Sequence, residues 1–225
     1  MRDRDWSERP FVTYLLIAAC VLMFLLEAVA GGSTSTAVLV RLGARVTPYV
    51  FAGEWWRLIT ATFLHIGIMH IAMNMLTLWF LGPLTEQLFG HTRFAVIYLL
   101  SGIIGNYAGL FFNSPNVVGA GASTALFGML GAFLMIGDNF RDNPAVAAMT
   151  KQFLILIGIN LLFDITQSNI DIAGHIGGLI GGFLVAGVCG APRFGRISTW
   201  KRVLMGVILV VSLLLLYFVY GGSLW

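Results

Sequence analysis

The chain has 225 residues, of which 58% are apolar and only 10% are charged. A soluble domain of average composition has about 25% charged residues, so water is excluded as the main solvent of this protein. The net charge is +3 and the 13 Lys and Arg residues are scattered singly or in pairs, which excludes the continuous basic stripe of a nucleic-acid-binding protein.

Long charge-free runs divide the chain into candidate membrane spans. A helix needs about 20 apolar residues to cross the hydrocarbon core of a bilayer. The run 94–137 is too long for one helix and is split by the turn sequence N-S-P-N at 113–116. An all-α, polytopic transmembrane helical bundle is the fold class that follows. The expected spans are 11–29, 65–82, 94–112, 122–137, 148–165, 172–190 and 203–220.

The positive charges indicate how these spans cross the bilayer. When the loops are assigned alternately to two sides, all Lys and Arg residues except three fall on the side of the N-terminus. The exceptions, Arg41, Arg45 and Arg57, lie in the long loop after the first span. The positive-inside rule therefore predicts a cytoplasmic N-terminus and a C-terminus outside. We expect an integral, multi-pass protein of a bacterial cell (inner) membrane.

That long loop, 30–60, is too mixed in composition for a simple connector. It interleaves apolar and aromatic residues, among them Tyr49, Trp55 and Trp56, with polar residues. Tyr and Trp prefer the membrane interface. The loop is therefore expected to be half sunk in the outer interface, with a flexible extracellular loop as the alternative.

Strongly polar side chains inside the spans are few, and such residues are candidates for a functional site. His70 and Asn74 lie in the second span, Ser123 opens the fourth, and His175 lies in the sixth. These three spans all run from outside to inside and carry their polar residues near their outer ends. At 1.5 Å rise per residue, we expect the four side chains within roughly 10 Å of one another in depth.

Ser123 and His175 each allow more than one interpretation. Small residues surround Ser123 at 119–125. The serine is therefore either a small polar residue that packs between helices or a nucleophile at a helix start. Gly174, Gly178 and Gly182 recur every four residues, so another helix must pack closely beside His175. If that helix is the fourth span, His175 reaches Ser123 as a general base. Otherwise it is an ion or proton ligand, or a satisfied polar group.

His70 and Asn74 are four residues apart and share one helix face. Beside Ser123, both could donate hydrogen bonds to the negative oxygen of a tetrahedral intermediate. A metal site is disfavoured, because this segment lacks the Glu and the second His of a zinc-protease helix and no Cys or acidic residue is expected to join the layer. We therefore expect no metal and no cofactor.

These motifs together resemble those of the rhomboid intramembrane serine proteases. They are H-x-x-x-N at 70–74, G-x-S at 121–123 and G-H-x-x-G-x-x-x-G at 174–182, in this order and on alternate spans. Trp56-Arg57 before the second span and Glu86 after it also match the family pattern. The resemblance covers about residues 10–190 and implies a rhomboid-like six-helix core with an additional seventh helix at the C-terminus.

The resemblance also implies a domain organisation and an activity. A short cytoplasmic N-terminus at 1–10 would precede the catalytic core at 11–190, and a cytoplasmic linker and the additional helix would follow at 191–225. The protein would be a serine endopeptidase that cleaves transmembrane protein substrates in or near the outer end of their spans. Its partners would be these substrates and the lipid bilayer, with no nucleic acid, and its oligomeric state is left open.

Residue roles follow from the same resemblance. Ser123 would be the nucleophile and His175 the base, a dyad without a required acid. The oxyanion hole would be formed by His70, Asn74 and the Ser123 backbone N–H. Supporting residues are implied at Gly121, Phe127, Gly178 and Gly182, and Phe127 can stack on the His175 ring.

Some features depart from this pattern or leave other functions open. Thr124 follows the serine where the family usually has Gly. Asp171, one turn before His175, is expected to cap its helix at the solvent-exposed outer end and not to complete a catalytic triad.

Two alternative functions remain open. One is a non-catalytic rhomboid-like protein that binds membrane helices; the other, less favoured because the sequence has no internal repeat, is a small transporter. Lys151 and Asp164 confine the span 148–165 to a short apolar centre, and it lacks the glycine spacing of the sixth span, so we expect it to act as the gate for substrate.

Overall fold

The computed structural model describes residues 9–167 and 170–220. Residues 1–8 of the expected N-terminal segment and residues 221–225 lie outside this description. Within it, six helices are long and apolar enough to cross a membrane, in agreement with the all-α, multi-pass fold class. They are α1 (Phe11–Val29), α5 (Gly67–Phe89), α6 (His91–Phe112), α8 (Pro144–Thr166), α9 (Ile172–Cys189) and α10 (Thr199–Tyr220).

The fourth expected span is a shorter helix in the interior of the bundle. This helix, α7 (Ser123–Asn139), has 17 residues. At 1.5 Å per residue it is about 25 Å long, less than the ~30 Å of a hydrocarbon core. All but four of its residues are buried, so its apolar composition reflects contact with other helices and not with lipid.

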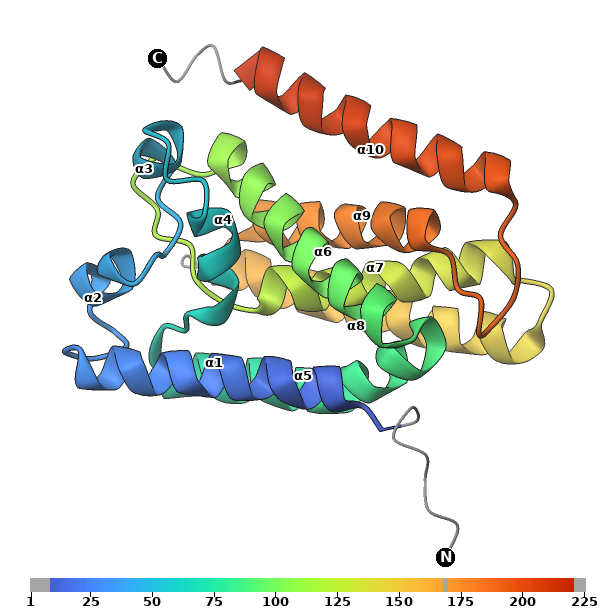
Figure 1. The fold of residues 1–225 in the computed structure, drawn as a ribbon, viewed down its shortest axis with the longest axis horizontal. Helices are drawn as coiled ribbons and strands as arrows, with labels where there is room; N and C mark the ends of the chain where they lie inside the picture. The colour runs from blue at the N-terminus through green and yellow to red at the C-terminus, as the bar shows by residue number, and fades with distance from the viewer. Residues whose placement is uncertain (1–8, 168–169, 221–225) are drawn as a thin grey trace, which may run out of the picture.

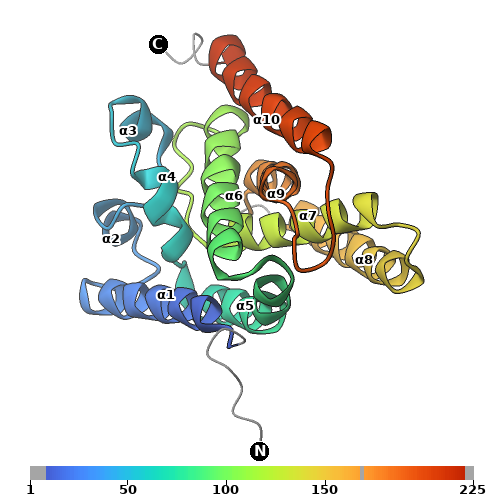
Figure 2. The same ribbon diagram turned by 45° about the vertical axis from the view of Figure 1, so that its right-hand side comes forward.

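The long helices form a bundle with α7 and α9 at its centre. In both views, α1 and α5 lie side by side along one edge and α10 lies along the opposite edge, with α6, α7, α8 and α9 between them (Figures 1 and 2). Met205 is the buried residue among the described side chains of α10; a Cβ at Gly187 of α9 would overlap its sulfur. The remaining apolar side chains of α10 are largely exposed, as expected for a helix that faces lipid.

The helices α7 and α9 pack backbone against backbone. A Cβ at Gly178 would overlap the carbonyl group of Thr124, and a Cβ at Gly182 would overlap the backbone of Gly128. Gly178 and Gly182, the glycine ridge of α9, therefore face α7, because only residues without side chains permit this approach. This contact places the beginning of α9 next to the beginning of α7.

The segment between α1 and α5 is ordered and contains short helices: α2 (Thr36–Arg41), α3 (Thr47–Phe51), α4 (Arg57–Thr60) and a 3₁₀ turn at Ala61–Phe63. They gather at the end of the bundle where α7 and α9 begin (Figure 1). The buried Arg57 holds them together, since it pairs with Glu54 at 2.6 Å and donates to the carbonyl oxygens of Val40 and Ala44 at 2.7 and 2.9 Å. The side chain of Trp55 remains 64% exposed. The segment 30–66 is therefore a folded unit; it is called the interfacial segment below after its expected position at the membrane interface, which stays a prediction.

The second span extends to Phe89, beyond its expected end at residue 82. The charge of Glu86 does not end the helix, because its buried carboxylate accepts hydrogen bonds from the N–H groups of Val12 and Thr13 at 3.0 and 2.9 Å. Those N–H groups belong to the first turn of α1 and have no acceptor within their own helix. Glu86 therefore caps α1 from the neighbouring helix.

The helix α8 packs on the bundle through one narrow stripe. Its buried residues are Val146, Phe153, Ile157 and Asp164, spaced by seven, four and seven positions, which places them on one side of the helix. Phe163 is 59% exposed and points away from the bundle. Apart from α10, α8 has the smallest buried share of the long helices; its displacement by a substrate stays a prediction.

Candidate active site

Ser123 is the first residue of α7, and the loop before it is held at two points. The N–H of Gly121 donates to the carbonyl of Ala61 at 2.9 Å, and Gly119 exchanges backbone hydrogen bonds with Arg45 at 2.9 and 2.8 Å. Gly121 has a φ of 137°, and a Cβ there would lie 2.7 Å from the ring of His70. Glycine is therefore required at 121, and the interfacial segment determines where the serine sits.

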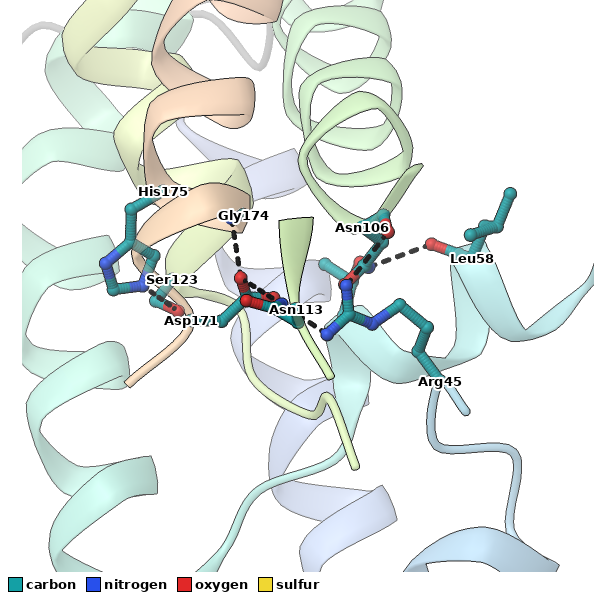
Figure 3. Close-up of polar contacts among 9 residues, drawn as sticks. Arg45, Leu58, Asn106, Asn113, Ser123, Asp171, Gly174 and His175 are labelled. Carbon is teal, nitrogen blue, oxygen red and sulfur yellow. Dashed lines mark hydrogen bonds and ion pairs between the residues drawn. The ribbon is translucent and has the colours of Figure 1, made fainter. Parts of the chain in front are cut away.

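The structure brings Ser123 and His175 together. The Ser123 Oγ lies 2.7 Å from the His175 Nε2 (Figure 3). His175 is in the first turn of α9 and is 6% exposed. The contact depends on the close approach of α7 and α9, so the glycine ridge sets the distance between the two side chains.

An acidic residue that the sequence analysis missed completes this arrangement. The Nδ1 of His175 lies 2.7 Å from Oδ2 of Asp164, in the last turn of α8, and Asp164 is 4% exposed. A carboxylate oxygen at this position accepts a hydrogen bond from Nδ1–H, which favours the tautomer in which the Nε2 lone pair faces Ser123.

The expectation that no acidic residue joins the polar layer is therefore wrong. In the sequence, Asp164 marks the end of the apolar centre of the fifth span, where a charged residue normally faces water. Its position seven residues after Ile157, on the buried stripe of α8, is the signal that could have revealed it. Only the packing of α8 against the bundle brings this stripe to α9.

Asp171 caps α9, as expected, but at a largely buried and paired position. It accepts from the N–H of Gly174 at 2.6 Å and from Nδ2 of Asn113 at 2.7 Å. It also forms an ion pair with Arg45 at 2.9 Å, and Arg45 donates to the carbonyl of Asn106 at 3.1 Å (Figure 3). Burial lowers the pKa of the Arg45 guanidinium, and the Asp171 carboxylate opposes this shift. Arg45 thus connects the interfacial segment to the start of α9.

His70 and Asn74 direct donor groups toward the backbone before Ser123. The Nδ1 of His70 accepts from the N–H of Ile66 at 3.3 Å, so a neutral ring carries its proton on Nε2. A Cβ at Gly121 would lie 2.8 Å from this Nε2 and 3.6 Å from Nδ2 of Asn74. That amide nitrogen is buried and has no hydrogen-bond partner among the described residues. It is a donor left free for an incoming oxygen.

The supporting residues pack around the base and the nucleophile. The Phe127 ring stacks on the His175 ring with a centroid distance of 4.3 Å and an interplanar angle of 15°. Thr124, in the place of the more usual Gly, is 4% exposed and fits because Gly105 of α6 has no side chain; a Cβ there would lie 2.8 Å from the Thr124 Cβ. The larger residue is therefore accommodated by a glycine on another helix.

Within residues 9–167 and 170–220, no group of three or more His, Cys, Asp and Glu side chains is placed to hold a metal ion. The chemistry available at this site is that of a hydroxyl, an imidazole, a carboxylate and several hydrogen-bond donors.

Comparison with known proteins gives a consistent family match. Residues 52–192 match the Rhomboid domain. The chain is 45% identical over 216 residues to Rhomboid protease GluP of Bacillus subtilis (strain 168), which covers 96% of this chain and 41% of GluP. It is 36% identical over 184 residues to Putative rhomboid protease YdcA of the same organism, covering 80% of this chain and 88% of YdcA.

A plant protein is also similar. RHOMBOID-like protein 7 of Arabidopsis thaliana is 38% identical over 159 residues, which cover 69% of this chain and 49% of that protein. The chain thus spans less than half the length of GluP and of the plant protein, and most of the length of YdcA.

Proposed function

The chain belongs to the rhomboid family, and from this premise and the geometry of its site we propose that it is a serine-type intramembrane endopeptidase. The observation that carries the proposal is the 2.7 Å contact between the Ser123 Oγ and the His175 Nε2. This pair lies at the helix starts of an apolar bundle with six candidate membrane spans. A nucleophile and a base within hydrogen-bond reach are the minimum for covalent acyl transfer.

In the proposed reaction, Ser123 attacks the carbonyl carbon of a peptide bond. As the Oγ–C bond forms, the hydroxyl proton moves to Nε2 of His175 and the carbonyl oxygen becomes negative. The Nε2 proton then passes to the leaving amine as the C–N bond breaks. Water hydrolyses the resulting acyl-enzyme by the same proton transfers, and Ser123 is restored.

The negative oxygen of the intermediate would be stabilised by an oxyanion hole. The candidate donors are Nε2 of His70, Nδ2 of Asn74 and the backbone N–H of Ser123, which has no acceptor within α7 because Ser123 is the first residue of the helix. The unpartnered amide of Asn74 supports this role. Preorganised donors of this kind stabilise the transition state more than the substrate.

The proposed substrates are transmembrane proteins. A carbonyl inside an intact helix is already hydrogen-bonded along its own axis, so a span must unwind locally before Ser123 can attack it. We expect cleavage at a small residue near the outer end of the span, followed by helix-weakening Gly, Pro or polar residues. Replacing those residues with Leu should slow cleavage, and an unchanged rate would contradict this requirement.

The proposal includes an orientation and a division of the chain. The N-terminus would be cytoplasmic, the C-terminus would be outside and the site would open to the outer side, as the distribution of Lys and Arg indicates. The catalytic core would comprise 11–190, with 191–225 as an addition. The largely exposed side chains of α10 support this division, because such a helix contributes little to the packing of the core.

The test uses the purified full chain in detergent. Ser123→Ala and His175→Ala should each abolish cleavage of a transmembrane substrate, and Ser123→Ala should also abolish labelling by a fluorophosphonate. Ser101→Ala is the matched control, because it makes the same change in α6, where the hydroxyl donates to the carbonyl of Tyr98; it should keep both activities. A folded wild-type protein that binds membrane helices without cleavage or labelling would instead be a non-catalytic relative, and the proposal would fail.

A further inference from the structure

The carboxylate of Asp164 occupies a position that packing alone does not explain. It continues the stripe Val146, Phe153 and Ile157, by which α8 contacts the bundle, and it is 4% exposed. A buried carboxylate is costly unless its charge is compensated. Its one hydrogen bond within the described part of the chain is to Nδ1 of His175. The side chain that faces this buried carboxylate is therefore the base of the proposed reaction.

We propose that Asp164 of α8 is a positioning residue that orients the imidazole ring of the base His175 and stabilises its positive charge. The base therefore has its carboxylate partner only while α8 is packed against α9. This inference rests on the proposed function. The acceptor at Nδ1 keeps the ring proton on that atom and leaves Nε2 free to take the proton of Ser123. When Nε2 receives the proton, the imidazolium gains a carboxylate counter-charge at 2.7 Å. The proton stays on the histidine and is not passed on to Asp164.

The contacts of His175 divide its support between two helices. Phe127 of α7 stacks on the face of the ring and sets its plane. Asp164 of α8 binds the edge of the ring and sets the tautomer. Phe127 lies on α7, at the buried centre of the bundle. Asp164 lies on α8, which contacts the bundle only through its narrow stripe of buried residues. Movement of α8 away from the bundle would therefore leave the ring stacked but remove its charge partner.

This arrangement links substrate access to chemistry. If a transmembrane substrate enters by displacement of α8, Asp164 leaves His175 as the site opens and returns as it closes. Ser123 is then fully activated only after α8 has packed back, which protects the open site from unproductive attack by the serine.

The test compares Asp164→Asn with the wild-type full chain in detergent. The carboxamide has nearly the same shape but no charge, and its N–H can donate to Nδ1, which favours the tautomer with the proton on Nε2. We expect kcat to fall by up to about 10⁴-fold, the loss that the corresponding Asp-to-Asn change causes in a Ser–His–Asp hydrolase. KM for a transmembrane substrate should change little. The rate of fluorophosphonate labelling at Ser123 should fall with kcat, because both report the activated hydroxyl.

Two control variants separate positioning from packing. Ile157→Ala removes buried contacts of the same stripe and keeps the carboxylate, so it should lower the unfolding midpoint while reducing kcat far less than Asp164→Asn. Asp142→Asn makes the same chemical change at an exposed turn residue and should have no effect. Nitrogen NMR of histidine-labelled protein should show the proton on Nδ1 of His175 in the wild type and a shift toward Nε2 in Asp164→Asn.

The outcomes distinguish this inference from the proposed function. Wild-type kcat in folded Asp164→Asn would overturn the role of Asp164 and leave the Ser123 and His175 proposal intact. Equal losses of kcat in Asp164→Asn and Ile157→Ala, at equal losses of stability, would show that Asp164 only packs and would also overturn it. An inactive, unlabelled wild type would instead overturn the proposed function itself.

Discussion

The ion pair between Arg45 and Asp171 offers a quantitative test of how the site is held. Arg45 contributes its backbone to the loop before Ser123 and its guanidinium to the cap of the helix that carries His175. Arg45→Met removes the charge and keeps the apolar stem. Asp171→Asn removes the partner charge and keeps an oxygen that can cap α9. The two variants therefore isolate the charge interaction from capping and from volume.

The structure predicts unequal costs for the two changes. Breaking a buried ion pair from one side costs about 3–5 kcal/mol of unfolding free energy, because an uncompensated charge stays buried. Asp171→Asn leaves a guanidinium that is 1% exposed, keeps the carbonyl oxygen of Asn106 as an acceptor and has an Nε without a partner among the described residues. Arg45→Met leaves a carboxylate that is 17% exposed and keeps two hydrogen bonds, from Gly174 and Asn113. We expect Asp171→Asn near the upper end of that range and Arg45→Met near its lower end.

The double variant provides the decisive comparison. With neither charge present, the double variant should cost less than the sum of the single changes by about 2 kcal/mol or more, because no unpaired charge remains. The assay is the unfolding free energy from titration of the detergent-solubilised protein with SDS, together with the rate of fluorophosphonate labelling at Ser123. Both single variants should slow labelling by displacing the start of α9. Strictly additive costs, or single-variant costs below about 0.5 kcal/mol, would refute this account.

Two further predictions concern the oxyanion hole and the gate. Asn74→Ala should lower kcat about 10²–10³-fold yet leave turnover measurable above Ser123→Ala, because other donors remain; equal inactivity of the two variants in a cleavage assay would show that the role of Asn74 is misassigned. Phe153→Ala removes a ring that stacks on α7 at 4.2 Å and should raise kcat/KM for a transmembrane substrate by loosening α8, without raising the rate of fluorophosphonate labelling. Phe163→Ala, at a position 59% exposed, is its control and should leave both rates unchanged; a faster labelling rate in Phe153→Ala would contradict the coupling between α8 and the base.

Much of the bundle follows from local properties of the sequence. The first span was predicted with the bounds that the structure gives α1, because hydropathy depends on each residue and its neighbours and needs no knowledge of the fold. The glycine spacing on the sixth span required a close helix partner for a similar reason, since a surface without side chains is readable from one helix alone. The polar layer of His70, Asn74, Ser123 and His175 was predicted from helix direction and rise.

Helix ends and charged residues were predicted less well. The second span was expected to end at residue 82, yet α5 continues through Pro83 to Phe89, and the charge of Glu86 in this extension is satisfied by the first turn of α1. The sequence marks Glu86 as polar but does not show that its partner is a helix end far away in the chain. A hydropathy pattern therefore places such a residue in water when the fold places it inside.

The two carboxylates beside the site show what the tertiary structure alone decides. Asp171 was expected at a wet helix end, and Asp164 was expected outside the polar layer, because an isolated carboxylate is most stable in water. The fold buries both by supplying partners: Arg45 from the interfacial segment for Asp171 and His175 from α9 for Asp164. The sequence by itself determined which residues are apolar and which helices they form, and it predicted which polar residues share a level. Which charges are paired inside the protein depended on how α8 and the interfacial segment pack, because the energy of a buried charge is set by neighbours that are distant in the chain.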